Sequence, residues 1–396
     1  MSRPRGAEAV DFPVPPSEAL EHSRRVTDVI RSEIDSTGRC ISFRRYMDLA
    51  LYAPGLGYYS AGSTKLGRGG DFVTAPELSR LYPVCVARQC AQLLEKTGGV
   101  ILEFGAGSGA MAVGILNALD AAGSLPDEYL ILEPSADLRR RQHDLLRSLP
   151  DGIRRRVRWL DALPAQPLRG VILANEVLDA MPVHRVCLHG GSVHELGVRW
   201  QSCGFEWVRM PAGPDVAEAA RAILGPFDAL PDGYTTEFNP GLRAWIAAVG
   251  DVLHEGAVLI FDYGYPRCEY YHPDRREGTL ICHYRHRAHP DPFLYPGLQD
   301  ISASVDFTLV AEGATAAGLE VGGFTTQAHF LIGCGVHELH EPAAPADERE
   351  RLEFAQQVRL LTLPGEMGER FKAIALLRGI AGPLTGFSAF DHRRRL

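Results

Sequence analysis

The sequence predicts an α/β fold built on a parallel, doubly wound sheet, and two observations lead to that prediction. Apolar runs of strand length recur along the middle of the chain, at 100–104, 129–132, 157–160 and 171–174. Helix-length segments separate these runs, and strands that alternate with helices favour a parallel sheet covered by helices. The glycine-bounded run GAVLIFDYGY at 256–265 supplies a fifth buried strand, so the pattern is Rossmann-like.

Two helical patterns precede the predicted sheet, over 17–36 and over 43–52, and Ser42 is placed to cap the second. Residues 53–80 are too rich in glycine for regular structure until Pro76 begins the next helix. We therefore expect a helical entry to the fold followed by a long glycine-rich loop.

Two insertions interrupt the main α/β domain. The segment near 183–212 alternates apolar and polar side chains about a Gly-Gly turn, which is typical of an inserted β-hairpin, and the segment 266–306 is dense in His, Pro, Tyr and Arg. We divide the chain into a helical extension with a glycine-rich cofactor loop over 1–95 and the main domain over 96–396. The remaining expected elements are helices near 235–253, 306–318 and 347–361 and strands near 325–332 and 371–377.

Charge and cysteine content limit the partners and the compartment. A net charge of −8 argues against nucleic acid, whose binding needs concentrated Lys and Arg. Surplus acid suits a basic partner such as an arginine-bearing segment, although it also serves solubility alone. The eight cysteines include no C-x-x-C pair, and the sequence has neither a signal-peptide pattern nor an apolar run that could span a membrane. We expect a reducing compartment, and specifically a cytoplasmic protein with no membrane partner.

The motif that points most directly to chemistry is VILEFGAGSGAMAVGIL, in which a buried strand runs into Gly105, Gly107 and Gly109 and then into a helix. Glycines there allow the backbone to approach a ligand while the helix N-terminus presents free N–H groups. A dinucleotide site would separate the second and third glycines by two residues, whereas only one stands between them here. This spacing, with Glu103 just before the turn, resembles motif I of class I methyltransferases.

Acidic residues follow the next two predicted strands. Glu133 ends the strand LILEP, where a carboxylate can bind both hydroxyls of a ribose, and Asp161 follows the third strand, where it can hold an adenine amine. Either residue could instead be a solvated surface acid. Together with the glycine loop they favour S-adenosylmethionine, and NAD remains the alternative.

Polar side chains also follow the fourth strand, in the run ANEVLDAMP. Asn175, Glu176 and Asp179 lie there at the carboxyl edge of the predicted sheet, beside the expected position of a sulfonium. Methyl transfer is an in-line displacement, so the enzyme aligns donor and nucleophile and disperses charge. Carboxylates suit a guanidinium acceptor because it stays protonated in water and binds carboxylates bidentately. The alternative is a helix start at which acidic side chains favour the dipole.

Nearly the whole chain resembles the MidA-like methyltransferases, whose mitochondrial members assist assembly of respiratory complex I. The matching segments are ISFRRYMDLALYAPGLGYYS, GRGGDFVTAPELS, LEFGAGSGAMA, ANEVLDAMPVHRV, TEFNPGLRAWI, VLIFDYGY, GTLICHYRHRAHPDPFLYPGLQDISASVDFT and MGERFKAIALLRG. The resemblance implies a seven-stranded class I methyltransferase fold and protein arginine methyltransferase activity. It also implies that the loop containing Asp71, Thr74 and Pro76 belongs to the cofactor site.

By position, the candidates for holding the substrate guanidinium are Glu176, Asp179 and Glu237, with Asp262 and Tyr263 as second choices. The partner expected from this reading is a protein that presents an arginine. Two other functions remain open. A small-molecule N- or O-methyltransferase would need a closed apolar pocket, and an assembly factor could bind the cofactor without turnover.

Two further features have simpler structural explanations. Residues His283, His286 and His289, near Cys268, His272 and Cys282, do not have zinc-finger spacing, so we predict no metal site. The helix near 347–361 has an apolar stripe that suits the core, although the stripe could also form a homodimer contact.

Overall fold

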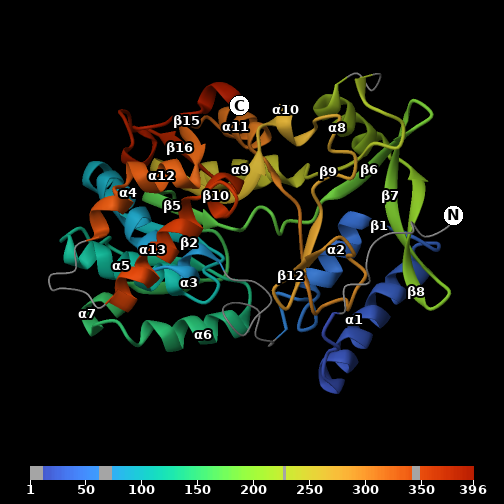
Figure 1. The fold of residues 1–396 in the computed structure, drawn as a ribbon, viewed down its shortest axis with the longest axis horizontal. Coiled ribbons are helices and arrows are strands. Elements are labelled where there is room, and N and C mark those ends of the chain that lie inside the picture. Colours follow the sequence, from blue (N-terminus) through green and yellow to red (C-terminus); the bar gives the residue numbers. More distant parts are fainter. Residues whose placement is uncertain (1–11, 62–73, 226–228, 341–347) are drawn as a thin grey trace.

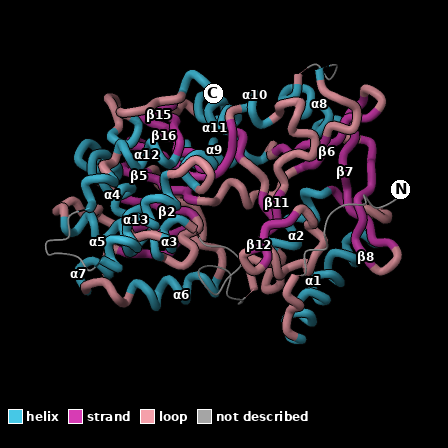
Figure 2. The backbone as a smooth tube through the Cα atoms, in the orientation of Figure 1, coloured by secondary structure: helices cyan, strands magenta, loops and turns pink. Residues whose placement is uncertain are grey.

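The computed structural model describes residues 12–61, 74–225, 229–340 and 348–396. A large sheet with its helices forms one lobe, and α1, α2 and the strands β6 to β8 form a second lobe beside it (Figure 1). The tube view in Figure 2 separates the strands of the two lobes from the loops that join them.

The main sheet confirms the predicted α/β fold. Its strands run in the order β15-β16-β10-β5-β2-β3-β4, and β14 (Val305–Asp306) pairs with the end of β10. The bounds are β2 (Val100–Phe104), β3 (Tyr129–Leu132), β4 (Val157–Leu160), β5 (Leu168–Asn175), β10 (Leu253–Tyr265), β15 (Glu320–Thr326) and β16 (Phe371–Arg378). The five strands from β10 to β4 are parallel, as predicted, but β16 is antiparallel to both of its neighbours.

Helices cover both faces of this sheet because side chains of a strand point alternately to its two faces. In β2, Ile101 packs into the core on one face and Leu102 into the core on the other. The first core is shared with α4 (Leu81–Thr97), α5 (Ala110–Ala121) and α12 (Gln327–Gly333), and the second with α9 (Gly241–Val252) and α11 (Phe307–Ala316). The remaining helices of this lobe are α3 (Ala75–Leu78), α6 (Ala136–Leu146), α7 (Asp151–Arg154), α10 (Arg267–Tyr270), α13 (Glu348–Thr362) and α14 (Met367–Arg370).

The second lobe has its own core. Helices α1 (Ser17–Ser36) and α2 (Phe43–Tyr52) pack against a curved sheet, and the Ser42 hydroxyl caps α2 by accepting from the Arg45 N–H, as predicted. The expected hairpin is a meander extended by two strands from elsewhere in the chain. Its strands are β1 (Ile41–Ser42), β6 (His184–His189), β7 (Ser192–Gln201), β8 (Gly204–Pro211) and β9 (Thr235–Phe238). Helix α8 (Pro214–Leu224) lies between β8 and β9 in sequence.

The segment 266–306, the second predicted insertion, contributes a small three-stranded sheet. Its strands are β11 (Ile281–Tyr284), β12 (Arg287–His289) and β13 (Asp300–Ser302). Cys282 and Ile301 of this sheet are buried in the same core as α1 and α2. The small sheet therefore joins the second lobe, whereas α10 and β14 at the ends of the segment belong to the main lobe.

Three predicted elements need correction. The helix expected over 235–253 begins with strand β9, because residues 235–238 pair with β6, and only then continues as α9. The strand expected over 325–332 ends at Thr326, whose hydroxyl accepts from the His329 N–H and starts α12. The apolar stripe of α13 is only partly buried, since Leu361 lies in the core while Leu352 is exposed. The homodimer stays a prediction.

A membrane-spanning helix is absent from the part of the chain that the structure describes, since none of its helices is both long and apolar enough.

The close packing of the central strands yields a stability prediction. Gly256 has φ +141°, and a Cβ there would lie 1.8 Å from the Gly170 carbonyl oxygen on the adjacent strand. We expect Gly256→Ala to lower the free energy of unfolding by roughly 2–4 kcal/mol in urea titrations. Gly152→Ala is the matched control, because no atom lies within 4 Å of its Cβ position, and it should change stability by less than about 0.5 kcal/mol. Equal effects of the two substitutions would contradict this packing account.

Candidate functional site

A cavity of about 440 Å³ opens at the carboxyl ends of β2, β3 and β5. Parallel α/β sheets bind ligands at this edge, since the loops that leave the strands diverge there. Its volume falls within the range of small-molecule sites. The polar residues that line it are Tyr52, Tyr59, Thr74, Glu103, Ser108, Glu133, Asn175 and Glu176.

The predicted glycine loop forms one wall of this cavity. Gly105, Gly107 and Gly109 have φ values of 59°, 56° and 88°, which other residues adopt only with strain. Gly109 is the N-cap of α5, so the loop leads into the free N–H groups of that helix. The loop therefore presents backbone donors to a ligand.

Two buried carboxylates flank the glycine loop. The Tyr129 hydroxyl donates to Glu103 Oε2 over 2.8 Å, and burial raises the pKa of Glu103 to about 7. Glu133 accepts from the Ser135 N–H over 3.0 Å and from Gln142 Nε2 over 3.2 Å, and burial raises its pKa as well. Each carboxylate keeps acceptor capacity for hydroxyl or amine donors of a ligand.

Gln142 is a positioning residue that no sequence motif indicates. Its Nε2 donates to the Gly107 carbonyl over 2.9 Å as well as to Glu133. The Trp159 indole N–H donates to Gln142 Oε1 over 2.8 Å and so fixes the amide orientation. A single side chain from α6 thus ties the glycine loop to the acid after β3, a link between distant segments that no local motif reveals.

The end of β5 holds Glu176 in a constrained geometry. Its backbone has φ +52°, and its N–H donates to the Phe261 carbonyl over 2.8 Å. The Tyr82 hydroxyl donates to Asn175 Oδ1 over 2.7 Å, and Asn175 Nδ2 lies 3.2 Å from Glu176 Oε1. Burial, and then the neighbouring Asp179 carboxylate, raise the pKa of Glu176 to about 8.

Asp179 and Asp262 lie behind Glu176 and outside the residues that line the cavity. Asp262 Oδ2 accepts from the backbone N–H groups of Leu178 and Asp179 over 2.9 and 3.3 Å, so it fixes the turn after β5. Its Oδ1 accepts from the Tyr263 N–H over 2.9 Å. Burial, and then the Asp300 carboxylate, raise the pKa of Asp179 to about 7. Burial also raises the pKa of Asp262 well above its usual value, so both of these groups favour the protonated form beside Glu176.

Two further predicted residues, Asp161 and Glu237, also lie outside the cavity lining. The Asp161 side chain is 93% exposed and pairs with Arg139 Nη1 at 2.7 Å, because the chain turns outward after β4. Glu237 is fully buried on β9, where Arg185 Nε lies 3.1 Å from Oε1 and the Thr279 N–H donates to Oε2 over 2.7 Å. Its carboxylate thus stabilises the packing of the second lobe. Asp71 lies outside the described residues, whereas Thr74 and Pro76 line the cavity as expected.

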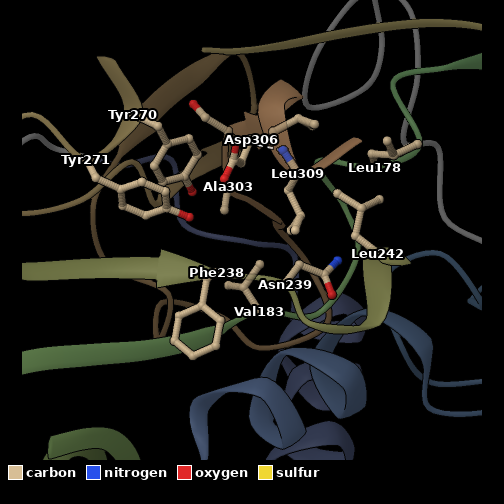
Figure 3. Close-up of a pocket in the computed structure, with 12 residues that line it drawn as sticks. Leu178, Val183, Phe238, Asn239, Leu242, Tyr270, Tyr271, Ala303, Asp306 and Leu309 are labelled. Carbon is tan, nitrogen blue, oxygen red and sulfur yellow. Dashed lines mark hydrogen bonds between the residues drawn. The ribbon is translucent and has the colours of Figure 1, made fainter. Parts of the chain in front are cut away.

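A second, much smaller cavity of about 20 Å³ lies beside Leu242, Tyr270, Tyr271 and Asp306 (Figure 3). It has room for about one water molecule, so it is no substrate site. Within the described ranges, no group of three or more His, Cys, Asp or Glu is arranged to hold a metal ion. His283 instead lies with Nδ1 3.6 Å from Asp300 Oδ2.

Comparisons with known proteins agree with this geometry. Residues 85–325 match a family described as "Putative S-adenosyl-L-methionine-dependent methyltransferase". The solved structure of a COG1565 superfamily member from Burkholderia thailandensis, bound to S-adenosyl-homocysteine, is similar with a TM-score of 0.92 and 44% identity, covering 98% of this chain and 100% of the other.

Curated relatives match over almost the same length. One from Drosophila melanogaster, named "Protein arginine methyltransferase NDUFAF7 homolog, mitochondrial", is 28% identical and covers 97% of this chain and 94% of its own. One from Danio rerio, named as the mitochondrial NDUFAF7 protein arginine methyltransferase, is 25% identical and covers 88% and 86%. The predicted cytoplasmic location is therefore wrong, since these relatives are named as mitochondrial. Cysteine spacing indicates a reducing compartment but cannot distinguish one such compartment from another.

The two acids after β3 and β4 give a direct test of the cavity as the ligand site. We expect Glu133→Gln to weaken binding of S-adenosyl-homocysteine by about 10- to 100-fold in calorimetry, because a charged acceptor for ligand hydroxyls is lost. Asp161→Asn is the control, and it should change the Kd by less than about threefold because its ion pair is exposed. Unchanged binding in Glu133→Gln would contradict the role of Glu133.

Proposed function

Because the chain belongs to this family of S-adenosyl-L-methionine-dependent methyltransferases, we propose that its methyl acceptor is an arginine side chain of a protein. Membership of the family confirms the resemblance drawn from the sequence, the methyltransferase fold and the cofactor. The observation that supports the acceptor most strongly is Glu176, a constrained carboxylate on the cavity wall with two further acids behind it. The names of the curated relatives point to the same acceptor.

The residues around the cavity suit the cofactor. Glu133 offers a buried carboxylate for ribose hydroxyls, and Gly105 and Gly107 let the backbone approach the ligand. Leu138 and Leu163 supply apolar surface beside Glu133 for a purine. When bound, S-adenosylmethionine supplies an electrophilic methyl group on a cationic sulfur.

The chain's own contribution is to hold and orient the acceptor. We propose that Glu176 binds the guanidinium through charge-assisted hydrogen bonds and so aims one nitrogen along the line of displacement. Asp179, with a carboxyl pKa of about 7, can lose its proton near neutral pH and then adds negative charge that favours the cation. Asp262 fixes the turn that carries Asp179. Because burial raises the pKa of Glu176 and Asp179, one of them can take the proton that methylated guanidinium releases.

The acceptor is tested by incubating the enzyme with a labelled-methyl donor and a protein extract, and then analysing the hydrolysed protein for methylarginine. We expect label in methylarginine with the wild-type enzyme and little with Glu176→Gln. Binding of S-adenosyl-homocysteine by Glu176→Gln, measured alongside, establishes that this variant still folds. Label confined to small molecules or to other amino acids would contradict the arginine proposal.

A pH profile tests the role of Glu176 separately. A carboxyl pKa raised to about 8 means that Glu176 is protonated below that pH and ionised above it, so kcat/KM should rise with pH and level off above about 8. Glu176→Gln should lower kcat/KM by about 100-fold or more and flatten the rise. An unchanged profile in the variant would show that another group titrates.

A further inference from the structure

Two tyrosines that the sequence analysis did not single out line the cavity beside the acids. Tyr52 ends α2 and Tyr59 follows it in the next turn, so both come from the second lobe. Their rings stack, with centroids 5.6 Å apart and planes inclined by 21°. The second lobe thus places an aromatic wall against a cavity built by the main sheet.

Both tyrosine hydroxyl protons are already committed. The Tyr52 hydroxyl donates to the Ala180 carbonyl over 2.8 Å, and the Tyr59 hydroxyl donates to Asp300 Oδ1 over 2.8 Å. A phenol has one O–H, so each oxygen can only accept from a ligand. The ring faces are also negative, because the quadrupole of an aromatic ring places negative charge above and below its plane.

The Asp300 carboxylate behind the two rings adds to the negative potential of this wall. Asp300 is 3% exposed, and its Oδ2 accepts from the Ser302 hydroxyl. Burial, and then the Asp300 carboxylate, raise the pKa of Tyr59 well above its usual value, while burial and then Asp179 raise that of Tyr52. The two phenols therefore keep their protons, and their hydroxyls continue to donate to Ala180 and Asp300.

Strand order places the anchor of Tyr52 at the end of the cavity where Glu176 lies. Ala180, which anchors Tyr52, follows Glu176 after β5, while Glu133 follows β3. Strand β2 lies between β5 and β3, so the two acids are separated by about two strand spacings, roughly 10 Å. The anchor of Tyr52 thus lies on the Glu176 side of the cavity.

We propose that Tyr52 and Tyr59 form a wall that accepts but does not donate hydrogen bonds, and that it selects a cationic, N–H-rich methyl acceptor over a carboxylate or phenolate. A guanidinium brings positive charge to the ring faces and donors to the phenol oxygens. An anionic methyl acceptor would place its oxygen lone pairs against those of the phenol oxygens. Its negative charge would also be repelled by the Asp300 carboxylate. The inference rests on the proposed function, since it assigns the acceptor to this end of the cavity.

The test uses two cofactor analogues that differ where the methyl group would be. Sinefungin carries a cationic amine at that point, and S-adenosyl-homocysteine carries none. We would titrate both into the wild-type protein, Tyr52→Leu and Tyr59→Leu by calorimetry. The wild type should bind sinefungin at least about fivefold more tightly than S-adenosyl-homocysteine, and each leucine variant should reduce that ratio at least about threefold.

Two further variants complete the design. Tyr59→Phe keeps the ring and removes the oxygen, so it should retain part of the preference for sinefungin. It also tests the role of the oxygen if Tyr59→Leu folds poorly. Leu138 lines the same cavity as Glu133, so Leu138→Ala should weaken the binding of both analogues by the same factor.

The outcomes separate this inference from the proposed function. A sinefungin preference that is equal in the wild type, Tyr52→Leu and Tyr59→Leu would overturn the wall, even if the methylarginine assay succeeds. A preference that falls in these variants supports the wall, even if methyl label is later found on another cationic group and the arginine proposal fails. A wild type that binds both analogues equally would also overturn the wall.

Discussion

The burial of carboxylates at the carboxyl edge of the main sheet is the constraint on which the rest of the site depends. Desolvation is the largest cause of the raised pKa in every one of them: Glu103, Glu133, Glu176, Asp179 and Asp262. Removing an ionised carboxylate from water is costly unless hydrogen bonds or a cation compensate. Glu103, Glu133, Glu176 and Asp262 are accordingly held by backbone or side-chain donors. The acids on the cavity wall are placed to receive donors or positive charge from a ligand.

The two lobes contribute different parts of this arrangement. The main sheet provides the glycine loop and the acids, because its parallel strands all end at one edge. The second lobe provides Tyr52 and Tyr59, whose hydroxyls anchor to Ala180 after β5 and to Asp300 on β13. Contacts between the lobes are thus part of the cavity itself, and the segment that precedes the sheet domain in sequence completes the cavity wall.

Local sequence patterns predicted the features that depend on short segments of the chain, namely buried strands and the residues that follow them. The glycine loop, Glu133 and Glu176 were found because each directly follows a buried strand, and the ends of such strands meet at one edge. Asp161 satisfies the same rule but turns outward to Arg139, which strand pattern alone cannot show. Glu237 was misplaced because its partner Arg185 lies on a strand that pairs with it only in the folded chain. The roles of Gln142, Tyr52 and Tyr59 depend on contacts between distant segments, and the antiparallel direction of β16 depends on the tertiary path of the chain.

We infer that the acids at the end of β5, half-buried Glu176 and buried Asp179, hold protons until a cationic group arrives. This claim is tested most directly by calorimetry of S-adenosylmethionine and S-adenosyl-homocysteine at pH 7 in two buffers of different ionisation enthalpy, which counts the protons exchanged on binding. With the pKa of Glu176 near 8 and that of Asp179 near 7, the cationic sulfonium should release more protons than the neutral thioether, by on the order of one per site. Equal proton exchange for the two ligands would contradict the claim.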